Sequence, residues 1–383
     1  MELANLQNSD PRATAEVVRR AAEVFAAGGL VIFPTETVYG IGAAAAHDRG
    51  YEALRNAKGR PDDQPFTLHI PTARAAELYA DLASPRLRRF VGKVFPGPVT
   101  LVVDVSDDQI AQSLARLGLP AWAADRLYHH NTVGLRCPDH PLARQVLGAV
   151  EGPVVASSAN LRGQRPPRDC AEAAQALGDR AGLVIDGGPC QYAKPSTVIQ
   201  IRAAGPAGST PTIRVLREGV YDERTIRRLL RWNVLMVCSG NTCRSPLAEA
   251  LARRQLAQAR GIATDELEAA GLFVASAGVA AADGMPASSG ALAAGSRLGL
   301  DLARHRSRSL TRDMIHQADL ILCMTRSHVQ AVLDLEPLAA ERVFPLDPAA
   351  DVEDPIGCGT EDYVRCAQRI DQALAARLKE HHP

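Results

Sequence analysis

A cysteine and an arginine are separated by five residues in the segment VLMVCSGNTCRSPLAEAL, which contains Cys238 and Arg244. An apolar, strand-like run precedes the cysteine, and the Ser245-Pro246 pair is typical of a helix start, with serine as the N-cap. A loop that ends on a helix N-terminus offers backbone N–H groups and a positive partial charge, which bind phosphate and stabilise a thiolate. The pattern therefore predicts that Cys238 attacks phosphorus while the Arg244 guanidinium holds two phosphoryl oxygens.

A phosphoryl transfer of this kind also needs a general acid for the leaving group. Asp354 in DVEDPIG is the predicted acid, held in a rigid loop by Pro355, with Asp351 and Glu353 as local alternatives. The same residue, now acting as a base, would activate the water that hydrolyses the phosphocysteine, and the Ser245 hydroxyl would help the thiolate to leave. We therefore expect a two-step reaction through a phosphocysteine intermediate.

Residues 232 to about 380 resemble the low-molecular-weight protein tyrosine phosphatase family in the order and spacing of C-x5-R-S and the Asp-Pro loop. The resemblance implies a Rossmann-like, four-stranded parallel sheet flanked by helices, a phosphoprotein substrate and no cofactor. It also implies that Asn241, Ser276 and His305 orient the phosphate loop. His328 is interpreted as an ordinary surface or core residue.

Two details of the sequence bear on the substrate. Family members that act on aromatic phosphoesters often place tyrosine just after Asp-Pro, whereas this chain has Ile356. Thr242 in the loop occupies the position at which the bacterial subgroup that resembles protein-arginine phosphatases carries threonine. The interpretation leans towards phosphoarginine, with phosphotyrosine as the alternative.

The other cysteines of the second domain bear on two alternatives to a phosphatase. Arsenate reductases share this scaffold but relay oxidation through further thiols, and Cys323, with no other cysteine before Cys358, leaves such a relay incomplete. Cys243 is either a disulfide partner that protects Cys238 under oxidation, as the resemblance implies, or a small buried residue. A phosphoprotein-binding module without activity is disfavoured, because the cysteine, arginine and aspartate of the reaction are all present.

The whole chain has the composition of a globular α/β protein. Its 383 residues suggest about two or three domains, and apolar runs at 30–33, 66–70, 98–105 and 182–185 alternate with helical patterns. Lys plus Arg and Asp plus Glu both number 43, so no overall cationic surplus favours nucleic acid. A secretory leader pattern and a run of about 18 apolar residues are both missing, which predicts a cytoplasmic, non-membrane protein. Eight cysteines without zinc-ligand spacing predict free thiols and no metal site.

The domain boundary is predicted after a β-hairpin. AAGPAGSTPT at 203–212 has the composition of a linker, but it lies between two β-rich runs that can pair with each other. We therefore interpret it as a hairpin loop, and we expect a first domain at 1–219, a helical connector at 220–231 and a second domain at 232–383.

The first domain contains no Walker loop or dinucleotide fingerprint. Its polar features are PTETVYG after a predicted strand, the pair Lys58 and Arg60, and ASSAN at 156–160. Each of these has an ordinary structural interpretation by itself, as a turn, a helix cap or a solvated pair of cations.

Taken in order, FPTETVYG, KGRP, FPGPVT, TVGLRCPDHP, SSAN, DGG, PSTV and LREG resemble the threonylcarbamoyl-AMP synthase (YrdC-like) family over residues 14 to about 219. The resemblance implies a twisted α/β domain with a large, concave, positively charged cavity. It implies that this cavity condenses L-threonine, bicarbonate and ATP, which arrives with Mg²⁺, into threonylcarbamoyl-AMP and pyrophosphate. The product serves adenosine 37 of certain tRNAs, and transfer to tRNA is expected to need partner proteins.

The same resemblance assigns two groups of residues in the first domain. The ATP-binding group is Lys58, Arg60, Thr132, Ser158, Asn160 and Arg217. The threonine-binding group is Thr35, His69, Arg136 and Ser196, with Arg136 as the partner of the amino-acid carboxylate. The sequence DDQPF departs from the family, which commonly shows a basic or amide residue and Pro-Leu there.

The first domain has two alternative functions. It could bind double-stranded RNA without making an adenylate, but the presence of Lys58, Arg60, Ser158 and Asn160 argues against this. Carbamoyl-AMP chemistry is the second alternative, and its relatives carry an acylphosphatase-like domain and zinc-finger cysteines that this sequence lacks.

Overall fold

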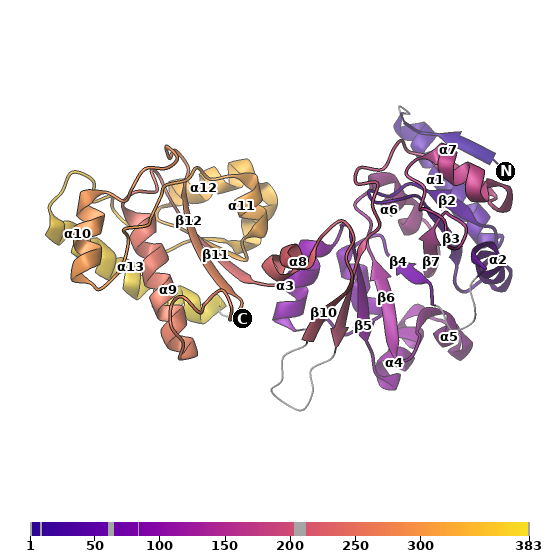
Figure 1. The fold of residues 1–383 in the computed structure, drawn as a ribbon, viewed down its shortest axis with the longest axis horizontal. Helices are drawn as coiled ribbons and strands as arrows, with labels where there is room; N and C mark the ends of the chain where they lie inside the picture. The colour runs from indigo at the N-terminus through magenta and orange to yellow at the C-terminus, as the bar shows by residue number, and fades with distance from the viewer. Residues whose placement is uncertain (1, 8–9, 60–64, 83, 203–211, 382–383) are drawn as a thin grey trace. The chain divides into compact units, whose positions relative to one another are not determined.

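A computed structural model of the chain describes residues 2–7, 10–59, 65–82, 84–202 and 212–381. The chain divides into two compact units, Met1–Arg228 and Leu229–Pro383, which are described separately (Figure 1). None of the helices among the described residues is both long enough and apolar enough to span a bilayer.

Within the described residues, the first unit is built on a single mixed sheet with the strand order β1-β8-β2-β3-β7-β4-β6-β5-β9-β10. Its strands are β1 (Glu2–Asn5), β2 (Val31–Phe33), β3 (Gly40–Ala44), β4 (Thr67–His69), β5 (Val99–Asp104), β6 (Thr132–Arg136), β7 (Val154–Ser158), β8 (Leu183–Asp186), β9 (Thr197–Arg202) and β10 (Thr212–Arg217). Its helices are α1 (Pro11–Ala26), α2 (Asp48–Lys58), α3 (Pro85–Val94), α4 (Asp107–Leu117), α5 (Ala124–Leu127), α6 (Pro141–Gly148), α7 (Cys170–Leu177) and α8 (Glu223–Leu229), with 3-10 turns η1 (Ala73–Leu78), η2 (Ala121–Ala123) and η3 (Gly178–Arg180).

One face of this sheet is covered by α1 and α6. Phe25 of α1 and Val146 of α6 are fully buried against Phe33 of β2 and Ile185 of β8. Asp10 caps α1 by accepting a hydrogen bond from the Ala13 N–H at 2.8 Å, which starts the helix where Pro11 suits its first turn. One hydrophobic cluster of the first unit therefore lies between these two helices and the sheet.

The predicted strands and the predicted hairpin of the first unit are confirmed. β2, β4, β5 and β8 fall on the four apolar runs, and β9 pairs antiparallel with β10. The predicted hairpin loop at 203–212 lies outside the described residues, except for its last position. The predicted helical connector contains α8.

The second unit has a four-stranded, fully parallel sheet in the part of the chain that is described, with the order β12-β11-β13-β14. Its strands are β11 (Trp232–Cys238), β12 (Leu272–Gly278), β13 (Leu320–Cys323) and β14 (Val343–Pro345). Its helices are α9 (Arg244–Arg260), α10 (Ser289–Arg297), α11 (Arg312–Gln317), α12 (Arg326–Leu335) and α13 (Thr360–His381), with the 3-10 turn η4 (Pro337–Arg342).

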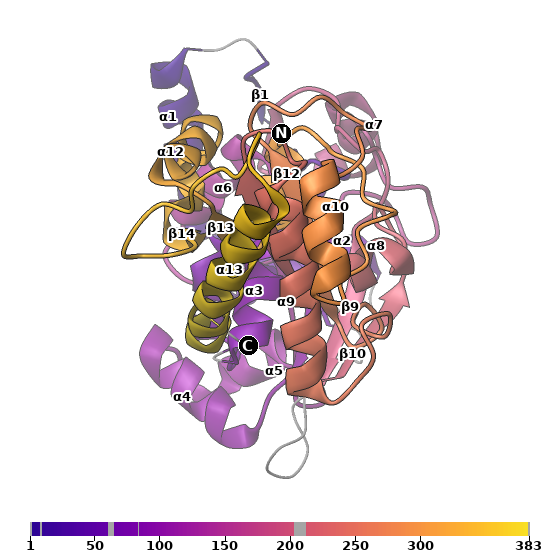
Figure 2. The same ribbon diagram turned by 90° about the vertical axis from the view of Figure 1, so that its left-hand side faces the viewer.

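Helices cover both faces of the second sheet, and the alternation along β11 shows which faces they cover. Met236 and Cys238 belong to the core under α9, α10 and α13, whereas Leu235 and Val237 belong to the core under α11 and α12. Figure 2 shows α9, α10 and α13 together as one layer. The fold class predicted for this unit, a parallel α/β sheet flanked by helices, is confirmed.

One local prediction is wrong. The sequence predicted Ser245 as the N-cap of α9, but the helix begins at Arg244 and Cys243 is the N-cap, without a side-chain capping bond. The physical reason is that the Ser245 hydroxyl has another partner, the sulfur of Cys238.

Candidate functional sites

The phosphate loop of the second unit joins the carboxyl end of β11 to the start of α9. Cys238 is the last residue of β11, where it pairs with Gly278 of the neighbouring strand. A Cβ atom at Gly278 would lie 2.4 Å from the carbonyl oxygen of Ser239 and 2.9 Å from the backbone nitrogen of Asn241. The loop therefore packs directly on the backbone of β12, and only glycine leaves room for it.

The sulfur of Cys238 is surrounded by hydrogen-bond donors. The residue is 2 % exposed, and its sulfur lies 2.9 Å from the Ser245 Oγ and accepts a hydrogen bond from the Asn241 N–H at 3.3 Å. Asn241 adopts a left-handed backbone conformation, with φ of 54°, which turns its N–H towards the sulfur. This arrangement suits a thiolate at the end of a buried strand.

A chain of side-chain hydrogen bonds fixes which way the Ser245 hydroxyl points. The Asn241 amide donates to the Oγ atoms of Ser245 and Ser276, both at 2.9 Å, and Ser276 donates to the Glu249 carboxylate at 2.6 Å. Because the Ser245 oxygen accepts from Asn241, its own proton is available for the Cys238 sulfur. Glu249, which the sequence did not single out, thus anchors the far end of the chain.

The predicted supporting residues meet around Asn241. The side chain of Ser276 bonds to its amide, and His305 Nε2 lies 2.7 Å from its carbonyl oxygen. The Arg308 N–H adds a bond of 2.9 Å to the Asn241 Oδ1. Thr242, the residue that bears on substrate choice, lies with its Oγ1 3.7 Å from the Cys243 sulfur.

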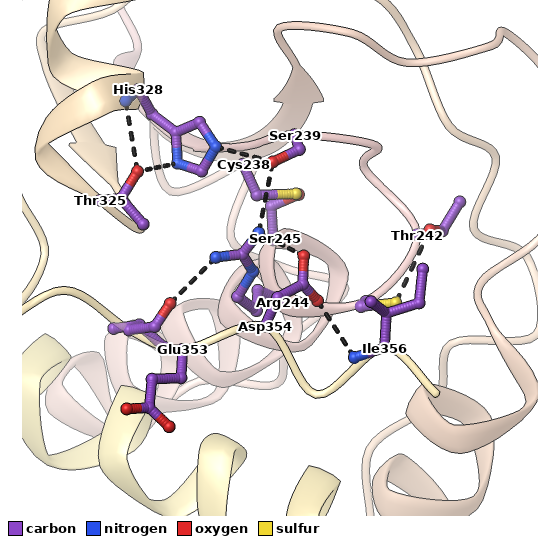
Figure 3. Close-up of polar contacts among 12 residues, drawn as sticks. Cys238, Ser239, Thr242, Arg244, Ser245, Thr325, His328, Glu353, Asp354 and Ile356 are labelled. Atoms are coloured by element: carbon purple, nitrogen blue, oxygen red, sulfur yellow. Dashed lines mark hydrogen bonds and ion pairs between the residues drawn. The ribbon is translucent and has the colours of Figure 1, made fainter. Parts of the chain in front are cut away.

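Arg244 is buried and bonded on both terminal nitrogens. Nη1 donates to the carbonyl oxygen of Val352 at 2.9 Å, and Nη2 donates to Asp354 Oδ2 at 2.5 Å and to the Ser239 Oγ at 3.3 Å (Figure 3). Its Nε has no hydrogen-bond partner among the described residues although it is buried. A buried N–H without a partner is costly, so this atom is suited to receive an anionic oxygen.

Of the three acids considered, Asp354 is the one bonded to the site's arginine. Asp351 is paired with Arg326 at 3.2 Å, and the Glu353 carboxylate points away from Arg244 in Figure 3. The Asp354 side chain is 35 % exposed, so it can reach both a bound phosphoryl group and solvent. This position suits the predicted acid and base.

The remaining cysteines of the second unit have structural surroundings. Cys243 packs 3.3 Å from the Ser288 Oγ and 3.4 Å from the Tyr363 hydroxyl. Cys323 is fully buried within β13, and burial raises its pKa, which disfavours the thiolate that a redox relay needs. All eight cysteines are unpaired in this structure.

In the first unit, a cavity of about 270 Å³ opens on the sheet. It is lined by seven of the residues that the sequence singled out: Thr35, His69, Thr132, Arg136, Ser158, Ser196 and Arg217. They come from β4, β6, β7 and β10 and from the segments after β2 and before β9. Both predicted groups, for ATP and for threonine, therefore contribute to one cavity.

Arg136 is held at the base of this cavity by a buried ion pair. Its Nη2 donates to Glu36 Oε1 at 3.1 Å and also to Thr37. Glu36, which the sequence did not assign, has a side chain 2 % exposed, and its second oxygen accepts the Asp139 N–H at 3.1 Å. The Arg136 Nε, by contrast, is buried without a partner in the described structure.

His69 is kept neutral by its position. It is 8 % exposed, and burial, together with the charge of Arg136, lowers its pKa to about 3. Its Nδ1 lies 3.0 Å from the Thr67 carbonyl oxygen, so the protonated nitrogen is Nδ1 and Nε2 remains an acceptor. A neutral histidine beside Arg136 leaves that cation as the dominant charge for an anionic ligand.

Arg217 and Ser196 form a second polar corner of the cavity. The Arg217 Nη2 donates to the Ser196 carbonyl oxygen at 2.8 Å, and the Ser196 hydroxyl lies 2.9 Å from the Thr100 hydroxyl. Arg217 and Arg136 both line the cavity, and burial and the charge of Arg136 lower the pKa of Arg217.

Lys58 and Asn160 do not line the cavity. The Lys58 ammonium donates to the carbonyl oxygen of Ser158 at 2.7 Å and to that of Asn160. It therefore holds the backbone of the segment 157–160 in place. Its direct contact with ATP stays a prediction, as does that of Asn160. Arg60 lies outside the described residues.

No group of three or more histidine, cysteine or carboxylate side chains with metal-binding geometry occurs in the described parts of either unit.

Comparison with protein families identifies both units. Residues 23–219 match the Sua5/YciO/YrdC model, described as "Telomere recombination", and residues 233–382 match the model described as "Low molecular weight phosphotyrosine protein phosphatase". A putative threonylcarbamoyl-AMP synthase of Mycobacterium tuberculosis is 33 % identical over 222 residues, which cover 58 % of this chain and 93 % of that protein. The threonylcarbamoyl-AMP synthase of Bacillus subtilis is 32 % identical over 51 % of each chain.

Two solved structures that are similar to the chain cover different shares of it. A YwlE mutant from Bacillus subtilis is 30 % identical and covers 39 % of this chain and 97 % of its own, with a TM-score of 0.35. A doubly substituted Sua5 from P. abyssi is 23 % identical and covers 72 % of this chain and 90 % of its own, with a TM-score of 0.49. The family matches establish that the chain belongs to the Sua5/YciO/YrdC family and carries a low-molecular-weight phosphatase domain behind its synthase-type domain.

Proposed function

We propose that the chain combines two enzymes, with a boundary in the segment 220–231. The first forms threonylcarbamoyl-AMP and pyrophosphate from L-threonine, bicarbonate and ATP with Mg²⁺, for the modification of tRNA by partner proteins. The second removes a phosphoryl group from a phosphoprotein through a phosphocysteine on Cys238.

The synthase proposal rests on the cavity around Arg136. The buried Arg136 guanidinium has an Nε without a partner among the described residues, and Arg217 supplies a second cation in the same cavity. His69, which also lines the cavity, is neutral. This combination suits a cavity that binds both a carboxylate and a polyphosphate. Because the reacting groups are the substrates themselves, these residues need only orient them and neutralise charge.

The synthase is tested by measuring threonine-dependent pyrophosphate release from ATP and bicarbonate. Arg217→Ala should raise the KM for ATP about tenfold or more, since it removes a charged donor from the cavity. Arg202→Ala, at an exposed end of β9, is the matched control and should behave like the native chain. A folded, ATP-binding protein without threonine-dependent release would instead favour the RNA-binding alternative.

The phosphatase proposal rests on the convergence of Cys238, Ser245, Arg244 and Asp354 at one end of β11. The Cys238 sulfur lies 2.9 Å from the Ser245 Oγ, and the Arg244 guanidinium is bonded to Asp354, which supports these roles. Native protein should hydrolyse p-nitrophenyl phosphate, and Cys238→Ser should abolish turnover, because the serine hydroxyl is not ionised at neutral pH. Turnover that survives this substitution would exclude the phosphocysteine route.

We further propose phosphoarginine as the preferred substrate. Thr242 in the loop supports it, and so does Ile356, whose side chain is aliphatic and 68 % exposed where an aromatic wall would stack on a phenyl ring. The values of kcat/KM for phosphoarginine and phosphotyrosine peptides should favour the former, and Ile356→Tyr should shift the ratio towards phosphotyrosine. A native preference for phosphotyrosine would contradict the proposal.

A further inference from the structure

His328 links a neighbouring strand to the phosphate loop of the second unit. It lies near the start of α12, which follows the carboxyl end of β13, and it is 5 % exposed. Its Nδ1 is 2.8 Å from the Thr325 Oγ1, and its Nε2 is 2.9 Å from the Ser239 Oγ in the phosphate loop (Figure 3). Both ring nitrogens are therefore engaged by hydroxyl groups.

The directions of these bonds follow from the partners of Ser239. Its Oγ accepts a hydrogen bond from the Arg244 Nη2 at 3.3 Å, and in the described structure its other side-chain partner is His328. The Ser239 proton is used only if it is donated to the His328 Nε2, which leaves the ring proton on Nδ1, facing Thr325. With a neutral imidazole, the Ser239 hydroxyl, the Thr325 hydroxyl and both ring nitrogens of His328 then each have a hydrogen-bond partner.

The charges around His328 agree with this tautomer. Burial, followed by the nearby charge of Arg244, lowers the pKa of His328 to about 4, although Asp354 and Asp351 act in the opposite direction. A protonated ring would present a second cation to Arg244 and would leave the Ser239 proton without an acceptor. The neutral form is the one that holds Ser239 with its oxygen turned to the guanidinium.

The orientation of Ser239 matters because the other contact of the same arginine nitrogen is with a residue that must move. Nη2 is bonded to Asp354 at 2.5 Å, and a general acid has to leave this contact to protonate a leaving group. Once Asp354 has moved, the Ser239 hydroxyl and the Val352 carbonyl oxygen are the remaining hydrogen-bond acceptors that orient the Arg244 guanidinium.

We propose that His328 is a positioning residue of the phosphatase site, which fixes the Arg244 guanidinium for the substrate phosphoryl group through the Ser239 hydroxyl. The inference rests on the phosphatase activity proposed above. It assigns a role to a histidine that the sequence alone predicts to be an ordinary surface or core residue, and it predicts that the effect of His328 depends on Ser239.

The test is a double-mutant cycle on the full chain, with hydrolysis of p-nitrophenyl phosphate as the readout. His328→Ala and Ser239→Ala should each lower kcat/KM about tenfold, and the double variant should be no worse than either. His328→Gln should recover most of the loss, because the glutamine carbonyl can accept the Ser239 proton from nearly the same place. His316→Ala, an exposed histidine on α11, is the matched control and should leave kcat/KM unchanged.

A second readout separates this inference from the phosphatase proposal. Calorimetric binding of inorganic phosphate reports how Arg244 holds an anion without any turnover, and His328→Ala should weaken it about tenfold while the midpoint of thermal unfolding stays close to the native value. Native protein that binds phosphate but hydrolyses nothing would overturn the phosphatase and leave the positioning role measurable. Additive losses in the cycle, no recovery by glutamine, or unchanged phosphate binding would overturn the role of His328.

Discussion

The Nη2 atom of Arg244 and the Oδ2 atom of Asp354 lie 2.5 Å apart, so the predicted acid is bonded to the predicted phosphate-binding arginine. The same guanidinium nitrogen cannot hold a phosphoryl oxygen in this geometry. A phosphoryl group held by both Nε and Nη2 of Arg244 therefore replaces the Asp354 carboxylate at Nη2, and the displaced carboxylate is then free to meet the leaving group.

Replacing Asp354 separates these two roles. Asp354→Asn should lower kcat for p-nitrophenyl phosphate about a hundredfold or more, because the general acid is lost. It should also tighten the binding of inorganic phosphate, since the competing carboxylate is gone. Steady-state kinetics and calorimetry measure the two effects, and weaker phosphate binding in this variant would show that the ion pair does not compete with the ligand. Asp351→Asn is the matched control.

The Ser245 hydroxyl should act mainly in the second step of the reaction. Ser245→Ala removes the donor that lies 2.9 Å from the Cys238 sulfur, so departure of the thiolate from the phosphocysteine should slow about tenfold. Rapid-mixing kinetics should then show a burst of the first product followed by a slower steady rate. Ser296→Ala, on an exposed position of α10, should show no such burst. A uniformly slow reaction without a burst would place the role of Ser245 in the first step instead.

Removing one partner of the buried pair of Glu36 and Arg136 should strongly destabilise the first unit. Arg136→Met leaves the Glu36 carboxylate buried without its cation and should lower the free energy of unfolding by about 3 kcal/mol or more. Adding Glu36→Gln to this variant should restore part of the loss. The chain contains two tryptophans, Trp122 and Trp232, so urea denaturation followed by fluorescence in a Trp232→Phe background reports the first unit alone.

His69 should make the first unit sensitive to acid. Its pKa is about 3 in the folded protein against an ordinary value of 6.5, so between these values the unfolded chain binds a proton that the folded chain does not. The free energy of unfolding should therefore fall as the pH decreases below 6.5, by at most about 1.4 kcal/mol for each pH unit from this residue. His69→Gln should flatten the dependence in the same fluorescence experiment. An unchanged slope would show that His69 is protonated in the folded unit.

The sequence was sufficient to predict those features that depend on neighbouring residues. The C-x5-R loop after a buried strand and the hairpin of β9 and β10 follow from short patterns, and the four apolar runs became strands. The position of Ser245 shows the limit of such patterns. A serine before proline is a typical N-cap, but a partner seven residues away, the Cys238 sulfur, determined its role.

The residues that the sequence missed all act across long separations. Glu36 reaches Arg136 100 positions away, Glu249 reaches Ser276 27 positions away, and His328 reaches Ser239 89 positions away. A signal for His328 was available in principle, because it follows β13, and carboxyl ends of parallel strands share one edge of a sheet. Its contact with the loop, however, depends on strand order, which a single sequence does not state.

Gly278 has a consequence for protein engineering. A single methyl group there would lie 2.4 Å from the Ser239 carbonyl oxygen. How closely the phosphate loop packs on the sheet is therefore determined by a residue on another strand. Transplanting the eight residues from Cys238 to Ser245 onto a different strand–helix scaffold would reproduce the binding loop only if the adjacent strand of the recipient also ended in glycine.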